Sequence, residues 1–259
     1  MHATSLDQLL QGLATAPPVQ VTGLALDSRR LRAGEAFVAL RGHRGHGLAH
    51  LSQALAQGAG AILWEPAASI PAPRAPVPCV EVEGLSVHVG EIAARYYGRP
   101  SEALFVAGIT GSDGKTSTAH LIAQSLSFLG RDCGYIGTLG VGSLASLELA
   151  THTTPDAISV QQHLDRMRGA GLGACAMEVS SHALDQHRVG AVQFDVAVLT
   201  NLSRDHLDYH GTVQRYAAAK RRLFEADDGR ALVLNRDDAH GARWIKRFAS
   251  VPRLRVYGI

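Results

Sequence analysis

The chain has 259 residues, which is enough for one large domain or two of ordinary size. Its 25 basic and 23 acidic residues nearly balance, so the sequence lacks the excess of basic residues that is typical of nucleic-acid-binding proteins. No apolar run approaches the roughly 18 residues of a membrane-spanning helix, and the 3 cysteines contain no C-x-x-C pair, which fits a reducing cytoplasm without structural zinc.

The first 100 residues carry short elements. Apolar runs occur at 23–26, 36–40, 61–63 and 79–82. One clear helix is expected at 50–57, and the proline-rich segment 71–78 predicts a surface loop. A second helical segment, 86–97, ends at Gly98-Arg99-Pro100, a combination that stops a helix. We therefore expect a domain boundary here, with one domain at 1–100 and another at 101–259.

After this boundary, apolar strands alternate with helices. The strands are expected at 104–109, 134–138, 174–179, 194–200 and 231–235, and the helices at about 115–129, 157–170, 212–225 and 239–248. Such alternation predicts a parallel sheet with helices on both faces. The expected fold class is therefore α/β, with a small N-terminal α/β domain followed by a parallel-sheet domain.

The segment 105–117, FVAGITGSDGKTS, carries the strongest functional pattern. An apolar strand runs into a glycine-rich turn, and Lys115 and two hydroxyl residues follow at the start of a helix. In a phosphate-binding loop, backbone N–H groups surround the phosphates, the lysine reaches the β and γ oxygens, and the Thr116 hydroxyl can bind Mg²⁺. The strict spacing would place the first glycine at Ile109, whereas this chain has Gly108. The segment is therefore either a phosphate-binding loop with its own spacing or a chance glycine turn.

Polar clusters follow four of the predicted strands. They lie at 108–117, 178–182, 201–206 and 235–238. In parallel sheets, ligands bind at the carboxyl ends of the strands. We therefore expect the four clusters to converge on one rim of the sheet and to form a site there.

Four segments, GITGSDGKTS, AMEVSSHALDQHR, TNLSRDHLDYHG and YAAAK, resemble in this order the Mur ligases of peptidoglycan synthesis, and among them the MurE type. The N-terminal LALDSRRLRAGEAFVAL resembles the uridine-nucleotide domain of that type. The resemblance covers essentially the whole chain. It implies a P-loop ATPase domain and a carbon-nitrogen ligase that uses ATP and Mg²⁺. The implied reaction adds the third amino acid to UDP-MurNAc-L-Ala-D-Glu through an acyl phosphate, with meso-diaminopimelate favoured over lysine because the chain is most similar to proteobacterial members.

The resemblance also implies the residues of the ATP and metal sites. The expected nucleotide contacts are Gly111, Ser112, Asp113, Gly114, Lys115, Thr116, Ser117 and Asn201, and Asp113 stands where the family usually has asparagine. The expected metal-binding residues are Thr116, Glu178, His206 and Lys220, and the last three act with Lys115 in catalysis. Lys220 matches a lysine that this family carbamylates. Three alternatives stay open: a salt-bridged carboxylate for Glu178, a structural imidazole for His206, and a solvated lysine on a basic helix for Lys220.

Substrate contacts are implied in both domains. Leu26 and Ser28 match uridine-binding positions, and the loop His43, Arg44 and Gly45 lies beside them. Thr153, Thr154, Ser180, Gln186 and Arg188 match contacts to the muramoyl peptide and phosphates. A planar guanidinium suits such a role, because it pairs bidentately with carboxylates and phosphates. As alternatives, 153–156 is also an ordinary helix-capping sequence, and Ser28 also suits a turn.

Mur ligases have three domains, and this sequence stops at 256–259 in a predicted strand of the middle domain. We therefore expect a fragment without the third domain. The expected partners are small molecules, with no nucleic acid and no membrane, and we expect a cytoplasmic monomer. Two other interpretations stay open. One is another ligase of the superfamily with a different acceptor, such as a folylpolyglutamate synthetase, and the other is a non-catalytic nucleotide-binding module.

Overall fold

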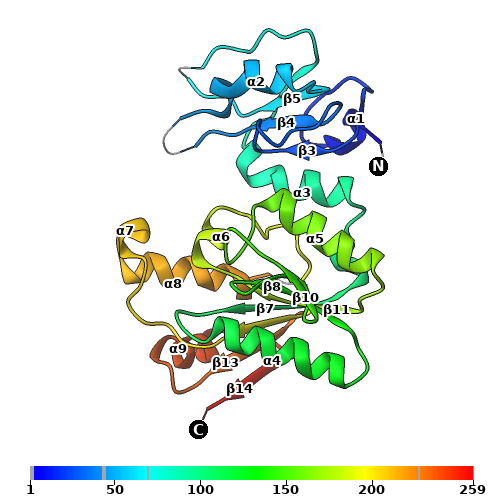
Figure 1. Cartoon of the computed structure of the whole chain (residues 1–259). Coiled ribbons are helices and arrows are strands. Elements are labelled where there is room, and N and C mark those ends of the chain that lie inside the picture. The colour runs from blue at the N-terminus through cyan, green and yellow to red at the C-terminus, as the bar shows by residue number, and fades with distance from the viewer. Residues whose placement is uncertain (1–2, 43–44, 69, 227, 259) are drawn as a thin grey trace. The chain divides into compact units, whose positions relative to one another are not determined.

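The computed structural model describes residues 3–42, 45–68, 70–226 and 228–258, and the chain divides into two compact units, Met1–Gly98 and Arg99–Ile259 (Figure 1). The first unit contains a parallel sheet with the strand order β3-β4-β5-β6. Its strands are β3 (Leu24–Ala25), β4 (Ala36–Ala39), β5 (Ala61–Trp64) and β6 (Cys79–Glu81). These strands are the four apolar runs of the sequence, and the two central strands are buried along their whole length.

Helices and a small ribbon complete the first unit. They are the antiparallel pair β1 (Thr4–Ser5) and β2 (Gln20–Val21), the helices α1 (Leu6–Leu9), α2 (Leu51–Ala56) and α3 (Leu85–Tyr96), and the 3-10 turn η1 (Gly47–His50). Helix α3 buries Leu85, Val89 and Ile92 along one face, as the spacing of an amphipathic helix requires. Its Arg95 also donates from Nη1 to the carbonyl of Leu9 at 2.9 Å, which ties α3 to the end of α1.

In the described part of the second unit, the sheet has eight strands in the order β10-β9-β8-β11-β7-β12-β13-β14. The strands are β7 (Phe105–Thr110), β8 (Cys133–Gly137), β9 (Gly140–Ser143), β10 (Ser146–Glu148), β11 (Ala174–Glu178), β12 (Val196–Leu199), β13 (Ala231–Asn235) and β14 (Leu254–Tyr257). The strands from β8 across to β14 are parallel, as the alternation of strands and helices predicts.

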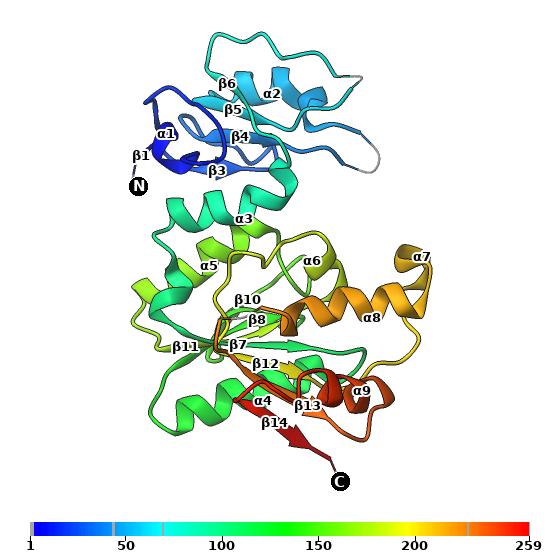
Figure 2. The ribbon, with the colours of Figure 1, turned by 180° about the vertical axis from the view of Figure 1, so that it is seen from behind.

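The parallel strands are covered on both faces. The helices are α4 (Lys115–Phe128), α5 (Ala157–Gly169), α6 (Ser181–Asp185), α7 (Leu207–His210), α8 (Val213–Arg221) and α9 (Ala239–Arg247), with 3-10 turns η2 (Pro100–Ala103) and η3 (Arg222–Phe224). Ala107 and Ala176 pack with α4, whereas Val106 and Met177 pack on the opposite face with residues of α5, α6, α8 and α9. Figure 2 shows α4 on one side of the sheet and α5 and α8 on the other. No helix in the described ranges is both long and apolar enough to cross a membrane.

The hairpin of β9 and β10 departs from the predicted alternation. Strand β9 is antiparallel to β8, and β10 is antiparallel to β9, with Leu147 opposite Gly142. The two strands extend the sheet beyond β8. Gly140 and Gly142 have positive φ angles of 140° and 139°, and a Cβ on either would lie 2.5 Å from a backbone oxygen of the partner strand. The hairpin therefore depends on these two glycines, which flank Val141, its one β-branched residue, whereas a strand is marked in the sequence by several such residues.

Candidate nucleotide and metal site

The glycine-rich loop follows β7, which lies between β11 and β12 in the sheet. Gly111 and Gly114 have positive φ angles of 154° and 78°. A Cβ on Gly111 would collide with the hydroxyl of Thr200, so this position requires glycine. Gly108 has a different role, because it lies inside β7, where a Cβ would be 2.7 Å from the ring of Phe194. Packing thus explains Gly108, and the loop itself begins at Gly111.

Residues after β12 hold the loop in place. The amide of Asn201 brackets the backbone of Asp113, since Oδ1 accepts from the Asp113 N–H and Nδ2 donates to its carbonyl, both at 3.1 Å. The Thr200 hydroxyl donates to the same carbonyl at 2.7 Å. Ser112 donates its N–H to the Asn201 carbonyl at 2.9 Å, and its hydroxyl accepts from the Ser203 N–H at 2.9 Å. Asn201 therefore supports the shape of the loop.

Lys115, the first residue of α4, folds back over the loop. Its ammonium group donates to the carbonyl oxygens of Gly111 at 3.0 Å and Ser112 at 2.8 Å. Burial lowers the pKa of Lys115 below its ordinary value. The charge of Lys115 is thus held against the glycine turn.

Lys220 reaches the same carbonyl from α8. Its side chain is 1% exposed, and Nζ donates to the Gly111 oxygen at 2.7 Å and to the Thr110 hydroxyl at 3.4 Å. Nζ also lies 4.6 Å from the centre of the Tyr216 ring. Burial, and then the charge of Lys115, lower the pKa of Lys220 to about 7. The alternative of a solvated lysine on a basic helix is therefore wrong.

Glu178, the last residue of β11, is fully buried at 0% exposure. Its Oε1 accepts from the Tyr135 hydroxyl at 2.5 Å and from the Thr138 N–H at 2.8 Å. Its Oε2 accepts from the Thr116 hydroxyl at 2.9 Å and from the Thr138 hydroxyl at 3.4 Å. None of the ion pairs among the described residues involves Glu178. The alternative of a salt-bridged carboxylate is therefore not what the structure contains.

The pair of Glu178 and Thr116 fits a hard divalent cation. A carboxylate and a hydroxyl oxygen are ligands that Mg²⁺ prefers, and a buried carboxylate without a basic partner favours a cation beside it. The described residues contain no group of three or more His, Cys, Asp or Glu side chains that could hold a metal ion. Two protein oxygens, from Thr116 and Glu178, would be compatible with a Mg²⁺ site that water and phosphate complete.

His206 is placed differently from the other predicted metal-binding residues. It precedes α7 with a positive φ angle of 49°, and its side chain is 46% exposed. Its ring lies 4.8 Å from the ring of His182, and its Nε2 lies 3.4 Å from a carboxylate oxygen of Asp205. Within the described residues, no hydrogen bond or ion pair joins His206 to Glu178 or Lys220. The structure thus brings Thr116 to Glu178, and it brings Lys220 and Lys115 to the same carbonyl. In the described part of the chain, the side chain of His206 is exposed and bonds to none of these four residues.

The predicted peptide-binding threonines adjoin Glu178. The Thr154 hydroxyl donates to the Glu178 carbonyl at 2.8 Å and accepts from the Ser180 N–H at 3.0 Å. The Thr153 hydroxyl lies 3.1 Å from that of Thr138, which itself contacts Glu178. The helix-capping alternative also applies here, since Asp156 accepts from two N–H groups of the first turn of α5. Capping explains Asp156 and leaves the two threonines at the site.

Arg188 and Gln186 form one network. The guanidinium donates from Nε and Nη2 to Gln186 Oε1 at 3.0 and 2.6 Å, and from Nη1 to the Thr154 carbonyl at 3.0 Å. Gln186 in turn donates to the Tyr209 hydroxyl at 3.1 Å. Burial lowers the pKa of Arg188. The guanidinium is thus fixed next to Thr154, with a single orientation.

The remaining predicted contacts lie in the first unit. Leu26 and Ser28 follow the carboxyl end of strand β3. The Ser28 hydroxyl donates to Gln53 Oε1 at 2.7 Å. The Gly45 carbonyl accepts from the N–H of Gly42 at 2.8 Å. His43 and Arg44 lie outside the described residues.

Some residues of the site carry no signal in the sequence. Tyr135 and Thr138 reach Glu178 from β8 and the residue after it, and the neighbouring register of β8 and β11 is the feature that could have indicated them. The cluster at 235–238 supports the loop instead of lining the site. Asn235 donates to the Thr200 carbonyl at 2.8 Å, and Asp238 accepts from the Leu202 N–H at 2.9 Å.

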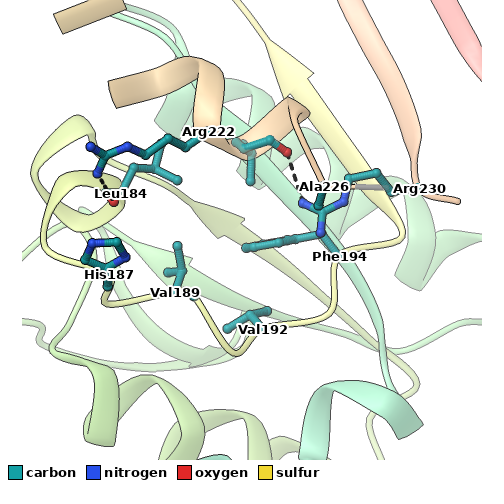
Figure 3. A pocket seen from close by; sticks show the side chains of 10 residues that line it. Leu184, His187, Val189, Val192, Phe194, Arg222, Ala226 and Arg230 are labelled. Atoms are coloured by element: carbon teal, nitrogen blue, oxygen red, sulfur yellow. Dashed lines mark hydrogen bonds between the residues drawn. The ribbon is translucent and has the colours of Figure 1, made fainter. Parts of the chain in front are cut away.

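A separate pocket of about 140 Å³ contains none of the predicted catalytic residues (Figure 3). It is mostly apolar, and its lining includes Phe194, which precedes β12, and Arg230, which precedes β13. Arg230 donates to the Leu223 carbonyl at 2.9 Å, and Arg222 donates to the Leu184 carbonyl at 3.2 Å. The pocket thus lies at the amino ends of the parallel strands, on the edge of the sheet opposite the glycine loop.

The fold and the site define an α/β protein whose parallel sheet carries a glycine-rich loop between β7 and α4. Residues 109–259 match the family described as Mur ligase middle domain, and residues 20–97 match the Mur ligase family, catalytic domain. A protein from Xanthomonas campestris pv. campestris (strain 8004), named UDP-N-acetylmuramoyl-L-alanyl-D-glutamate--2,6-diaminopimelate ligase, is 52% identical over 259 residues, covering 100% of this chain and 52% of that protein. The chain belongs to the Mur ligase family.

Solved structures agree with this assignment. A structure titled UDP-N-acetylmuramoyl-L-alanyl-D-glutamate--2,6-diaminopimelate ligase superposes with a TM-score of 0.84 and 31% identity, covering 99% of this chain and 53% of the other. The MurF ligase from Thermotoga maritima in complex with ADP shares the fold, with a TM-score of 0.61 and 23% identity over 91% of this chain and 50% of the other. The chain spans about half the length of the curated relatives that it matches.

Proposed function

We propose that this chain forms the nucleotide-binding parts of an ATP-dependent ligase that adds meso-diaminopimelate to UDP-N-acetylmuramoyl-L-alanyl-D-glutamate. One observation carries the ATP site: Lys115 and Lys220 donate to the same carbonyl of Gly111, while Thr116 bonds to the buried Glu178. The name of the relative that is 52% identical supports the acceptor and the amino acid.

The glycine loop would hold the phosphates of ATP. Its backbone N–H groups and the start of α4 favour anions, and Lys115 would exchange its bonds to the Gly111 and Ser112 carbonyls for bonds to phosphate oxygens. Thr116 and Glu178 would hold Mg²⁺, with His206 as a further candidate ligand. When bound, Mg²⁺ would neutralise charge on the phosphates. Asn201 would act on ATP through the shape of the loop.

Lys220 is proposed to carry a carbamate. With a pKa of about 7, a large fraction of its amine is neutral near neutral pH, and the neutral amine is the form that attacks CO₂. In that step an N–C bond forms and the amine loses a proton, which leaves an N-carboxylate anion. The charge of Lys115 on the same loop would stabilise this anion, and the carbamate would supply an oxygen ligand for Mg²⁺.

The chemical step transfers the γ-phosphoryl group of ATP to the D-glutamyl carboxylate, forming ADP and an acyl phosphate. The amine of the incoming amino acid then attacks the acyl carbon, and phosphate leaves as the amide forms. Because no side chain of the chain forms a covalent bond in these steps, its residues would contribute position and charge. Arg188, fixed by Gln186 and Thr154, is suited to bind a carboxylate of the peptide, and Thr153 and Ser180 lie beside it.

The uridine part would bind in the first unit, at Leu26, Ser28 and the loop that contains Gly45. Small molecules would be the only partners, with neither nucleic acid nor a membrane involved. Soluble nucleotide substrates place the proposed reaction in the cytoplasm, and we propose a monomer.

Calorimetry tests this function. We expect the chain to bind both ATP with Mg²⁺ and UDP-MurNAc-L-Ala-D-Glu. Ser28→Ala should lower the affinity for the sugar nucleotide and leave the affinity for ATP unchanged. Binding of a folate in place of the sugar nucleotide would indicate another ligase of the superfamily. Binding of ATP without either acceptor would indicate a non-catalytic nucleotide-binding module, and failure to bind ATP would refute the proposal.

A further inference from the structure

The two carboxylate oxygens of Glu178 are held by different parts of the protein. Oε1 accepts two short hydrogen bonds from the β8 side, from Tyr135 at 2.5 Å and the Thr138 N–H at 2.8 Å. Oε2 accepts from Thr116, the second residue of α4, at 2.9 Å, and more weakly from the Thr138 hydroxyl at 3.4 Å. Oε1 is therefore hydrogen-bonded to β8 and the residue after it, and Oε2 is bonded to the start of α4 beside the glycine loop.

We propose that Tyr135 is a positioning residue, which fixes Oε1 of Glu178 so that Oε2 and the Thr116 hydroxyl form the cation site. This inference rests on the proposed Mg²⁺-nucleotide function. A carboxylate held at one oxygen by two donors cannot turn about its last bond without breaking them. Partners of this kind orient metal ligands, and their loss typically weakens metal binding about 10–100-fold.

The strand register places Tyr135 for this role. Tyr135 lies opposite Ala176 in the parallel pair of β8 and β11. Glu178 is two residues beyond Ala176, and alternate residues of a strand point to the same face. Tyr135 and Ala176 both belong to the core cluster that packs against Ala123 of α4. The Tyr135 ring is thus anchored in the core under the loop, and its hydroxyl reaches forward along the sheet to Glu178.

Gly137 leaves the space for this contact. A Cβ on Gly137 would collide with both Glu178 Oε1 and the Tyr135 hydroxyl. Since Gly137 is two residues after Tyr135 on the same strand, any side chain there would enter the gap between the two groups. The backbone of β8 therefore accommodates the Tyr135–Glu178 hydrogen bond.

The test measures ATP affinity by calorimetry over a series of Mg²⁺ concentrations and in EDTA. Tyr135→Phe keeps the ring and removes the hydroxyl. We expect the Mg²⁺ concentration for half-maximal tightening of ATP to rise by about 10-fold or more, with ATP affinity in EDTA unchanged. Gly137→Ala should shift the Mg²⁺ dependence in the same direction. Tyr96→Phe, which removes the hydroxyl of a buried tyrosine in the first unit, is the matched control and should show the Mg²⁺ dependence of wild type.

Two results would overturn the inference. One is a Tyr135→Phe variant with the Mg²⁺ dependence of wild type. The other is an equal loss of ATP affinity with and without Mg²⁺, because that pattern indicates a general structural role. If wild-type protein bound ATP with no dependence on Mg²⁺, the proposed metal site itself would fail, which distinguishes that outcome from a failure of Tyr135 alone.

Discussion

The buried Lys220 predicts a specific dependence of stability on pH. Its pKa is about 7 in the folded chain, against an ordinary value of 10.5. The unfolded chain therefore binds this proton more strongly, and protonation favours unfolding. The resulting loss of stability is full below pH 7 and is relieved as the pH rises from 7 toward 10.5. From about pH 6 to about pH 9, linkage gives a gain of about 2–3 kcal/mol from this one group.

Lys220→Met removes the titrating group and keeps an apolar chain of similar length. We expect the free energy of unfolding of the wild type, relative to this variant, to rise by about 2–3 kcal/mol between about pH 6 and about pH 9. Groups that titrate in both proteins cancel in this difference. Because a carbamate would change the charge of Lys220, the buffers must be free of CO₂.

The assay is urea unfolding followed by tryptophan fluorescence. The chain has 2 tryptophans, Trp64 in the first unit and the buried Trp244 in the second. A Trp64→Phe background makes the signal report on the unit that contains Lys220. Equal pH dependence in the wild type and in Lys220→Met would refute the assignment of Lys220 as a buried amine with a lowered pKa.

Three further variants test the loop. Gly111→Ala should cost more than about 2 kcal/mol of unfolding free energy in urea titrations, because its Cβ collides with Thr200; a stable variant would contradict the loop geometry. Asn201→Ala removes two hydrogen bonds to the Asp113 backbone, so it should weaken ATP binding about 10-fold in calorimetry and lower the free energy of unfolding by only about 1 kcal/mol. Unchanged ATP affinity would show that the loop holds its shape without these bonds. Asp113→Asn should make ATP binding more favourable by less than about 1 kcal/mol in the same assay, because solvent screens the exposed charge of Asp113. Weaker ATP binding in this variant would mean that Asp113 contributes a contact to ATP.

The elements of the second unit could be predicted wherever apolar runs are long. The helices expected at about 115–129 and 157–170 are α4 and α5, and the strands expected at 174–179 and 231–235 are β11 and β13. The sequence does not predict the hairpin of β9 and β10, because its strands pair through glycines and carry a single β-branched residue, Val141. Strand patterns indicate which segments are buried, and give less information where glycine permits a close approach.

The candidate site was only partly predictable for a similar reason. The glycine loop and Glu178 follow strands, so the rule for parallel sheets finds them. The burial of Lys220 could not be read from its helix, where arginines on either side indicate a solvated face. Tyr135 looks like an ordinary core residue of a strand, and only the register of β8 with β11 brings it to Glu178. Contacts between strands distant in sequence decide such roles, and a single sequence does not record them.

The most direct test of a Mg²⁺-dependent ATP site at the glycine loop is calorimetry of ATP binding with Mg²⁺ to wild type and Lys115→Ala. Lys115 holds its charge against the turn, with hydrogen bonds to two of its carbonyls. We predict saturable, Mg²⁺-dependent binding to the wild type and no measurable binding to the variant, while UDP-MurNAc-L-Ala-D-Glu binds both equally. Equal ATP affinity in the two proteins would contradict the phosphate-loop assignment.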